Sequence, residues 1–190
     1  MLDASLARRL RLVALDVDGV LTDGGIYLGR VGDHAVELKR FDIQDGLAVL
    51  LLRAAGITVV LLSGRSSEAT TLRAREIGVD EVVQDDAARK LPAFEALLAR
   101  RGIALDACAF AGDDLADLPV LRRVALPIAV ANAVAEVRAV ATYVTAAPGG
   151  RGAVREIAEA ILKARGAWDG LVRQYLEERG DVAQRAAGSR

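Results

Sequence analysis

The sequence predicts an α/β fold built on a doubly wound parallel β-sheet. Short apolar runs rich in β-branched residues or alanine alternate with segments that repeat apolar residues every three or four positions, which is typical of βαβ units. The chain has 190 residues, 53% of them hydrophobic, which is enough to form the core of one domain. Glycines also follow several of the helical segments, as expected where helices end.

The predicted strands are residues 12–17, 57–62, 81–83, 107–111, 127–130 and 143–145. The predicted helices are residues 46–55, 67–77, 90–101, 115–124, 134–140 and 153–165. Gly56, Gly78 and Gly102 directly follow three of these helices, where a left-handed residue is common. We therefore expect a sheet with helices on both faces.

The segment 23–41 departs from this alternation. It is rich in glycine, and a turn region at residues 29–33 separates two apolar stretches. The apolar residues are Ile26, Tyr27, Leu28, Val36, Leu38 and Phe41. This pattern predicts a short β-hairpin after the first strand, which we call the flap.

Residues 1–166 are predicted to form a single domain with no inserted second domain. Residues 167–190 are predicted to add a short amphipathic helix, around residues 171–176. The polar run 181–190 follows this helix, and we expect it to be mobile.

Charge and composition exclude several kinds of partner. The net charge of -1 and the pI of about 5.9 provide no field that would attract nucleic acid or an anionic membrane. Asp16 and Asp18 interrupt the apolar segment of a faintly signal-like N-terminus, and no other stretch approaches the roughly 20 uncharged residues that span a bilayer. We therefore expect a cytoplasmic protein.

Polar residues follow the predicted strands at the ends where open parallel sheets bind ligands. They are Asp16-Val17-Asp18-Gly19 after the first strand, Ser63-Gly64-Arg65 after the second, Lys90 shortly after the third, and Gly112-Asp113-Asp114 after the fourth. Because the carboxyl ends of parallel strands lie along one edge, we expect these residues to converge on one crevice.

The aspartates predict a metal site. Asp16 and Asp18 are two residues apart, so their side chains point the same way on an extended strand. With Asp113 and Asp114 they place three or four negative charges together, which requires a cation or raised pKa values. Because the ligands are all oxygens, Mg²⁺ is the favoured ion and a phosphate is the favoured partner.

Ser63, Gly64 and Lys90 are predicted to bind that phosphate. A hydroxyl, the backbone N–H groups of a glycine turn and an ammonium group can all hold phosphate oxygens. Each feature alone is more often a surface turn or a solvated lysine. Their combination in this order indicates phosphoryl transfer, in which positioning and charge neutralisation do most of the work.

Four stretches of the chain resemble the motifs of phosphatases of the haloacid dehalogenase superfamily. They are Asp16-Val17-Asp18-Gly19-Val20-Leu21-Thr22-Asp23-Gly24, Leu61-Leu62-Ser63-Gly64-Arg65, Lys90 and Gly112-Asp113-Asp114-Leu115-Ala116-Asp117. Their order and spacing agree with the family, and the resemblance covers about residues 10–165. It implies the Rossmann-like haloacid dehalogenase fold and a Mg²⁺-dependent phosphatase.

The resemblance also implies how the residues act. Asp16 would be the nucleophile that is transiently phosphorylated, and Asp18 would protonate the leaving oxygen and then activate water. Mg²⁺ would be held by Asp16, the backbone carbonyl of Asp18 and Asp113.

Further residues are expected to support this chemistry. Asp114 and Asp117 would hold the metal ligands from behind. Arg65 and Arg151 are expected to contact the substrate. Arg151 lies in the stretch Gly149-Gly150-Arg151-Gly152, which we expect to be a flexible element.

Within the superfamily the chain is most similar to the phosphatases of 3-deoxy-D-manno-octulosonate 8-phosphate, which act in lipopolysaccharide biosynthesis. The similarity lies in Thr22-Asp23-Gly24, in Phe41-Asp42-Ile43-Gln44-Asp45-Gly46 and in Gly149-Gly150-Arg151-Gly152-Ala153-Val154-Arg155-Glu156. It implies a hairpin in place of a cap domain and a homotetramer in which neighbours close each site. Gln44 stands where many relatives carry a basic residue, and the tail from Trp168 exceeds the usual length.

Three other functions remain open. The substrate could be another sugar-acid phosphate, such as a sialic-acid-type 9-phosphate. A phosphoacceptor signalling module would carry its aspartate after the third strand, where Val82-Val83-Gln84 leads to nothing comparable. An inactive scaffold is disfavoured because Asp16, Asp18, Ser63, Lys90 and Asp113 are all present.

Overall fold

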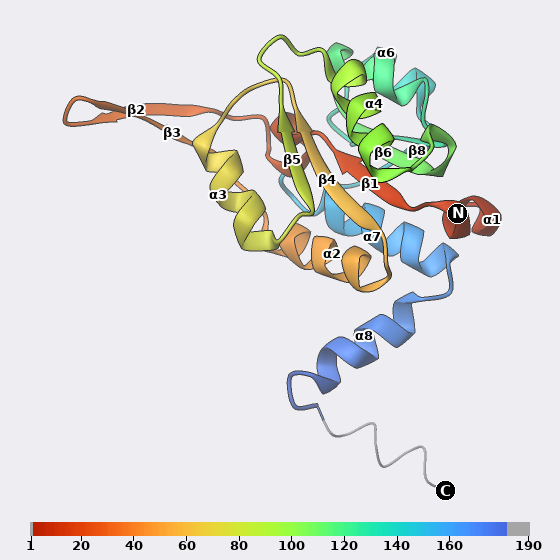
Figure 1. Cartoon of the computed structure of the whole chain (residues 1–190). Helices are drawn as coiled ribbons and strands as arrows, with labels where there is room; N and C mark the ends of the chain where they lie inside the picture. The colour runs from red at the N-terminus through yellow and green to blue at the C-terminus, as the bar shows by residue number, and fades with distance from the viewer. Residues whose placement is uncertain (1, 182–190) are drawn as a thin grey trace, which may run out of the picture.

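The structure, a computed structural model, describes residues 2–181, so the run predicted to be mobile, 181–190, lies outside the described residues apart from its first position. Six strands form a parallel sheet in the order β5-β4-β1-β6-β7-β8 (Figure 1). They are β1 (Leu12–Leu15), β4 (Thr58–Ser63), β5 (Glu81–Gln84), β6 (Cys108–Gly112), β7 (Leu126–Ala129) and β8 (Tyr143–Val144). The predicted α/β fold with a parallel sheet is confirmed.

The helices of the described chain are α1 (Ala4–Arg9), α2 (Ile43–Ala54), α3 (Glu68–Ile77), α4 (Lys90–Arg101), α5 (Leu118–Leu121), α6 (Ala135–Val140), α7 (Ala153–Ala164) and α8 (Trp168–Glu177). Figure 1 shows α2, α3 and α7 on one side of the sheet and α4 and α6 on the other. None of the helices in the described part of the chain is both long and apolar enough to cross a membrane.

Three helices differ from the prediction. The sequence does not reveal α1, which begins after the capping side chain of Asp3. Helix α2 begins earlier than predicted because the Asp42 side chain accepts a hydrogen bond from the Gln44 backbone N–H, which caps the helix. The helix predicted at 115–124 is divided into a short turn, η3 (Leu115–Asp117), and α5, because Asp114 and Asp117 cap each other's backbone in η3.

The flap is the predicted β-hairpin. Strands β2 (Tyr27–Val31) and β3 (His34–Leu38) pair antiparallel and project from the body of the protein (Figure 1). Its apolar side chains face solvent in the single chain: Leu28 is 80% exposed and Leu38 is 61% exposed. The flap therefore carries apolar surface that the chain does not bury by itself.

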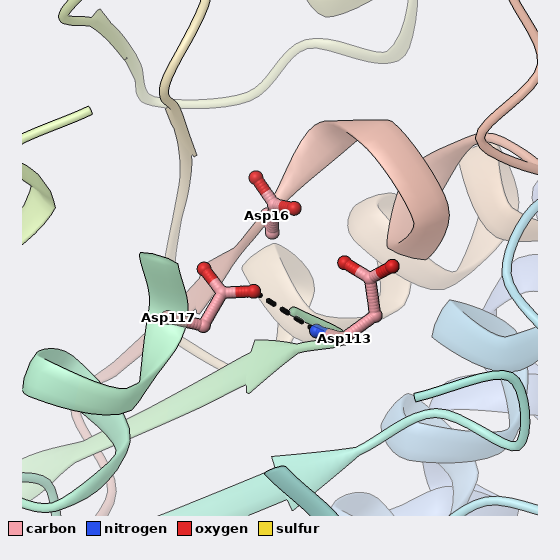
Figure 2. Close-up of side chains that lie close together, drawn as sticks. All are labelled: Asp16, Asp113 and Asp117. Atoms are coloured by element: carbon pink, nitrogen blue, oxygen red, sulfur yellow. Dashed lines mark hydrogen bonds between the residues drawn. The ribbon is translucent and has the colours of Figure 1, made fainter. Parts of the chain in front are cut away.

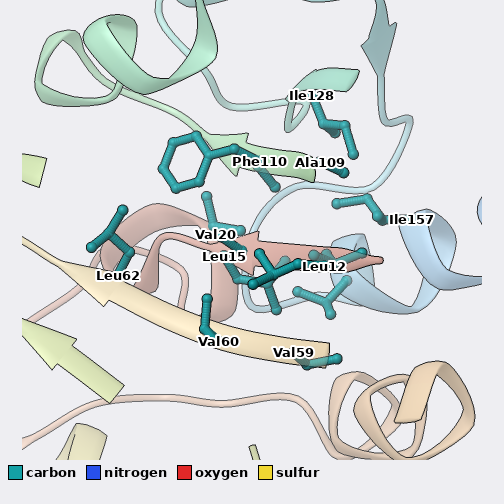
Figure 3. Packing of buried hydrophobic residues seen from close by; sticks show 14 of the residues in the cluster. Leu12, Leu15, Val20, Val59, Val60, Leu62, Ala109, Phe110, Ile128 and Ile157 are labelled. Atoms are coloured by element: carbon teal, nitrogen blue, oxygen red, sulfur yellow. The ribbon is translucent and has the colours of Figure 1, made fainter. Parts of the chain in front are cut away.

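The core is centred on β1, which lies between β4 and β6 (Figure 3). All four residues of β1 are fully buried, as are Val60 on β4 and Phe110 on β6. Burial of each large apolar side chain contributes about 1.5–3 kcal/mol to folding. This packing fixes the point at which β1 ends, and hence the position of the next residue, Asp16.

Asp45 joins α2 to the start of α7. Its side chain is fully buried, and its Oδ1 accepts a hydrogen bond of 2.8 Å from the backbone N–H of Arg155. Gly152, which precedes α7, has no side chain to cap the helix, so Asp45 serves as a cap from a neighbouring helix. Oδ2 has no hydrogen-bond partner among the described residues, and burial raises the pKa of Asp45 to about 6.

We predict that Asp45→Asn changes how stability depends on pH. An acid whose pKa is raised by folding binds its proton more tightly in the native state, so its contribution falls as pH rises from about 4 to 6. The raised pKa corresponds to a loss of about 3 kcal/mol in the free energy of unfolding over this range. The Asn variant lacks this loss because its amide does not titrate. Urea unfolding at pH 4 and pH 7 measures this: equal pH dependence in both proteins would contradict the assignment.

Candidate active site

A cavity of about 230 Å³ lies at the carboxyl ends of β1, β4 and β6. The predicted site residues that line it are Asp16, Asp18, Ser63, Gly64, Arg65, Lys90, Asp113, Asp114 and Asp117. Ala88 and Ala116 complete the lining, and Arg151 is not part of it. The structure thus brings together every predicted site residue except Arg151.

Lys90 links two carboxylates at the floor of the cavity. Its Nζ lies 2.6 Å from Asp16 Oδ1 and 2.6 Å from Asp117 Oδ1, and all three side chains are buried. Burial raises the pKa of Asp16 to about 8, and the nearby Asp117 carboxylate adds to this rise, while Lys90 opposes it. Burial alone would lower the pKa of Lys90, but the two carboxylates outweigh it and raise this pKa. The lysine therefore stays charged beside Asp16.

Asp113 completes a cluster of three carboxylates (Figure 2). One oxygen from each of Asp16, Asp113 and Asp117 lies within 4.8 Å of the others. Burial, followed by the charge of Asp117, raises the pKa of Asp113 to about 6, and its buried Oδ1 has no hydrogen-bond partner among the described residues.

These residues fit a magnesium ion. One ammonium group facing three carboxylates leaves two negative charges uncompensated, which matches a divalent cation. The donor atoms are all oxygens, which hard ions such as Mg²⁺ prefer. Both oxygens of Asp117 are engaged, since Oδ1 pairs with Lys90 and Oδ2 accepts from the backbone N–H groups of Asp113 and Asp114. Asp117 therefore holds the backbone of Asp113 in place. Support of the metal ligands is the role that the sequence predicts for Asp117.

The sequence suggested that Asp16 and Asp18 lie on an extended strand, but the structure differs. Strand β1 ends at Leu15, and a wide turn, η1 (Val17–Leu21), follows Asp16, closed by a hydrogen bond from the Thr22 N–H to the Val17 carbonyl. Gly19 in this turn has a φ of 96°, and a Cβ there would lie 2.0 Å from the Asp113 carboxylate. Only glycine allows this approach, so the turn still directs both aspartates into one cavity.

Asn132 fixes the same turn, and sequence reasoning missed it. Its amide N–H donates to the Gly19 carbonyl at 2.9 Å, and its Oδ1 accepts from the Gly149 N–H at 2.7 Å. A signal was present, because Asn132 is a polar residue just past the predicted strand 127–130, at the same edge of the sheet as the other site residues.

The stretch predicted to be flexible is instead packed against this turn. Gly149 and Gly150 are buried, and a Cβ on Gly149 would lie 1.8 Å from the Gly19 carbonyl oxygen. Gly150 N–H donates to the Val20 carbonyl at 3.1 Å. This packing leaves Arg151 exposed and outside the cavity lining of the single chain.

A second set of charges surrounds Asp18 and includes two flap residues that the sequence did not single out. Lys39 Nζ lies 2.8 Å from Asp18 Oδ1, and Arg65 Nη1 lies 3.6 Å from Asp18 Oδ2. Glu37 on β3 pairs with Arg65 at 2.9 Å and accepts a hydrogen bond from the Ser67 hydroxyl. That hydrogen bond, with the nearby cations Lys39 and Arg65, lowers the pKa of Glu37. This set has balanced charge.

Ser63 and Gly64 form the wall opposite the aspartates. Ser63 ends β4 and is 2% exposed, and its hydroxyl donates to the Arg65 carbonyl while accepting from the Arg65 N–H. A Cβ on Gly64 would lie 3.1 Å from the Ala88 Cβ, so glycine keeps this turn close to the loop before Lys90. The turn therefore places its backbone next to the lysine.

Known proteins are similar to this chain in sequence and in fold. The haloacid dehalogenase-like hydrolase family matches residues 83–157. The 3-deoxy-D-manno-octulosonate 8-phosphate phosphatase of Escherichia coli strain K12 is 41% identical over 163 residues, which is 86% of this chain and 85% of that protein. The enzyme of Yersinia pestis is 40% identical over 164 residues, which is 86% of each chain.

Solved structures agree with these relatives. The 3-deoxy-D-manno-octulosonate 8-phosphate phosphatase of Moraxella catarrhalis, solved with a magnesium ion, a phosphate ion and KDO, superposes with a TM-score of 0.85 at 39% identity, covering 90% of this chain and 97% of that one. The cobalt-bound phosphatase of Haemophilus influenzae gives a TM-score of 0.77 at 34% identity, covering 85% and 92%. By its site, sequence and fold, the chain belongs to the haloacid dehalogenase-like phosphatases, in the family of the 3-deoxy-D-manno-octulosonate 8-phosphate phosphatases.

Proposed function

We propose that the chain is a Mg²⁺-dependent phosphatase that converts 3-deoxy-D-manno-octulosonate 8-phosphate to the free sugar acid and phosphate, a step of lipopolysaccharide biosynthesis. The observation that carries the proposal is Asp16 beside Lys90 at 2.6 Å, at the floor of a cavity that Asp113 and Asp117 also line. The identity to phosphatases of this name supports the choice of substrate.

The chain's residues divide the reaction into two steps. Asp16 attacks phosphorus while the bond to the sugar oxygen breaks, and Asp18 gives its proton to that oxygen. Asp18 then takes a proton from the water that hydrolyses the aspartyl-phosphate. Lys90, Ser63 and the backbone beside Gly64 hold the phosphoryl oxygens. Magnesium, when bound by Asp16, Asp113 and the Asp18 backbone carbonyl, would supply positive charge to the phosphoryl group.

Arg65 is proposed to recognise the sugar-acid carboxylate. It lines the cavity, its side chain is 43% exposed, and its buried Nη1 has no hydrogen-bond partner among the described residues. A guanidinium in this position can form the paired hydrogen bonds that carboxylates favour. Another sugar-acid phosphate, such as a sialic-acid-type 9-phosphate, would offer the same group. Turnover of a panel of sugar-acid phosphates, with neutral sugar phosphates as controls, tests the substrate.

The proposal extends to assembly and location. A homotetramer would bury the exposed apolar side of the flap, and a neighbouring subunit could then bring Arg151 to a substrate. A cytoplasmic location is supported by the N-terminal apolar segment, because β1 is part of the folded core and two aspartates closely follow it. Cell fractionation would test the location.

We predict that Asp16→Asn lowers turnover at least about a thousandfold while the fold is retained, because an amide has the shape of the carboxylate but is a far weaker nucleophile. Phosphate release and circular dichroism measure the two properties. Activity above a few per cent of wild type would remove Asp16 from the nucleophile role.

We predict that a chelator abolishes activity and that added Mg²⁺ restores it. Asp113→Ala should raise the Mg²⁺ concentration needed for half-maximal activity by about tenfold or more, since it removes one of three clustered carboxylates. Asp106→Ala, outside the cavity lining, is the matched control. Full activity in excess EDTA would contradict the metal requirement.

We predict that Tyr27→Asp breaks the assembly and lowers activity, because it places a charge on the exposed apolar face of the flap, which Tyr27 shares with its strand partner Leu38. Val144→Asp, on β8 at the far edge of the sheet, is the control. Light scattering measures the mass of each species. A wild-type monomer with full activity would refute the tetramer.

A further inference from the structure

Lys39 is a buried lysine that the proposed mechanism does not use. It directly follows β3 at the base of the flap, and its side chain is 0% exposed. Its Nζ lies 2.8 Å from Asp18 Oδ1, 3.6 Å from Glu37 Oε1 and 3.3 Å from the Thr70 hydroxyl on α3. A buried ammonium group needs such partners, because burial without them would favour loss of its charge.

The two carboxylate oxygens of Asp18 have different surroundings. Oδ1 is buried and faces the ammonium of Lys39. Oδ2 lies 3.6 Å from Arg65 Nη1, which exceeds hydrogen-bond distance. Oδ1 is buried, whereas the Asp18 side chain as a whole is 22% exposed, so Oδ2 is the oxygen left for proton transfer.

Lys39 itself does not reach the substrate. Asp18 and Arg65 line the cavity, whereas Lys39 and Glu37 do not. The lysine stands behind Asp18, between the flap and the first turn of α3, where Thr70 is fully buried. Lys39 can affect the cavity through Asp18 or through Glu37 and Arg65, and its contact with Asp18 is the shorter of the two, at 2.8 Å against 3.6 Å.

We propose that Lys39 is a positioning residue that fixes the Asp18 carboxyl group so that Oδ2 exchanges protons with the reacting groups. The proposal rests on the proposed phosphatase function. In the first step, the proton on Asp18 Oδ2 passes to the leaving sugar oxygen as its bond to phosphorus breaks and the bond from Asp16 forms. In the second step, the same oxygen takes a proton from the attacking water, which restores the acid.

Leaving-group dependence tests this proposal. A sugar alkoxide needs a proton in order to leave, whereas p-nitrophenolate does not. In a single turnover with radiolabelled phosphate, Lys39→Met should slow phospho-enzyme formation from the sugar phosphate by about 10- to 100-fold, and from p-nitrophenyl phosphate by less than about threefold. KM for the sugar phosphate should stay within about twofold, and Lys39→Arg should recover part of the rate because it keeps the cation.

A double-mutant cycle separates positioning from other roles. If Lys39 acts through Asp18, adding Lys39→Met to Asp18→Asn should cause no further loss. Lys163→Met, which removes a surface ammonium paired with Glu159 on α7, is the matched control and should leave both rates unchanged.

Several results would overturn the proposal. They are equal losses for both phosphate donors, a raised KM with unchanged turnover, or additive effects of the two substitutions. If wild type forms a phospho-enzyme from other alkyl phosphates but not from the sugar-acid phosphate, the proposed substrate is wrong, while the leaving-group comparison still tests Lys39 with those alkyl phosphates.

Discussion

The site depends on the contact between one lysine and a group of carboxylates. Asp16, Asp113 and Asp117 gather where β1 and β6 end, and Lys90 is the cation that pairs directly with two of them. Burial raises the pKa of Asp16 to about 8, so these carboxylates by themselves resist being charged all at once. A divalent cation would reverse this effect, because it stabilises the charged form of Asp16. In the proposed mechanism, metal binding and activation of Asp16 are thus two aspects of one electrostatic constraint.

The backbone around Asp16 is shaped by this constraint. Groups that repel stay together only if the segments that carry them cannot separate, and the core packing of β1 supplies part of that restraint. The turn after Asp16 supplies more of it, because Gly19 approaches Asp113 closely and Asn132 joins Gly19 to Gly149. Glycines at these points allow three segments that are distant in sequence to meet at backbone distance.

The sequence was sufficient for the fold and for most of the site, because each depended on a local pattern. Strand and helix periods identify the sheet, and the polar residues after its strands identify the cavity. Lys39 and Glu37 were missed because they lie in the hairpin rather than at a strand end of the sheet, and only tertiary structure brings the hairpin back to Asp18. The stretch around Arg151 was predicted to be flexible because a glycine-rich context is typical of a loop, but its glycines serve close packing.

The flap has two faces because a strand has a period of two. Glu37 and Lys39 are two residues apart and both contribute to the charges around Asp18, whereas Leu38 between them is 61% exposed. One face therefore carries charges that surround Asp18, and the face with Leu38 is exposed apolar surface. A subunit that packs on Leu38 would restrain the same short segment that holds Lys39 against Asp18. Assembly and proton transfer would then be coupled through the backbone of three consecutive residues, so that the flap does more than close the cavity.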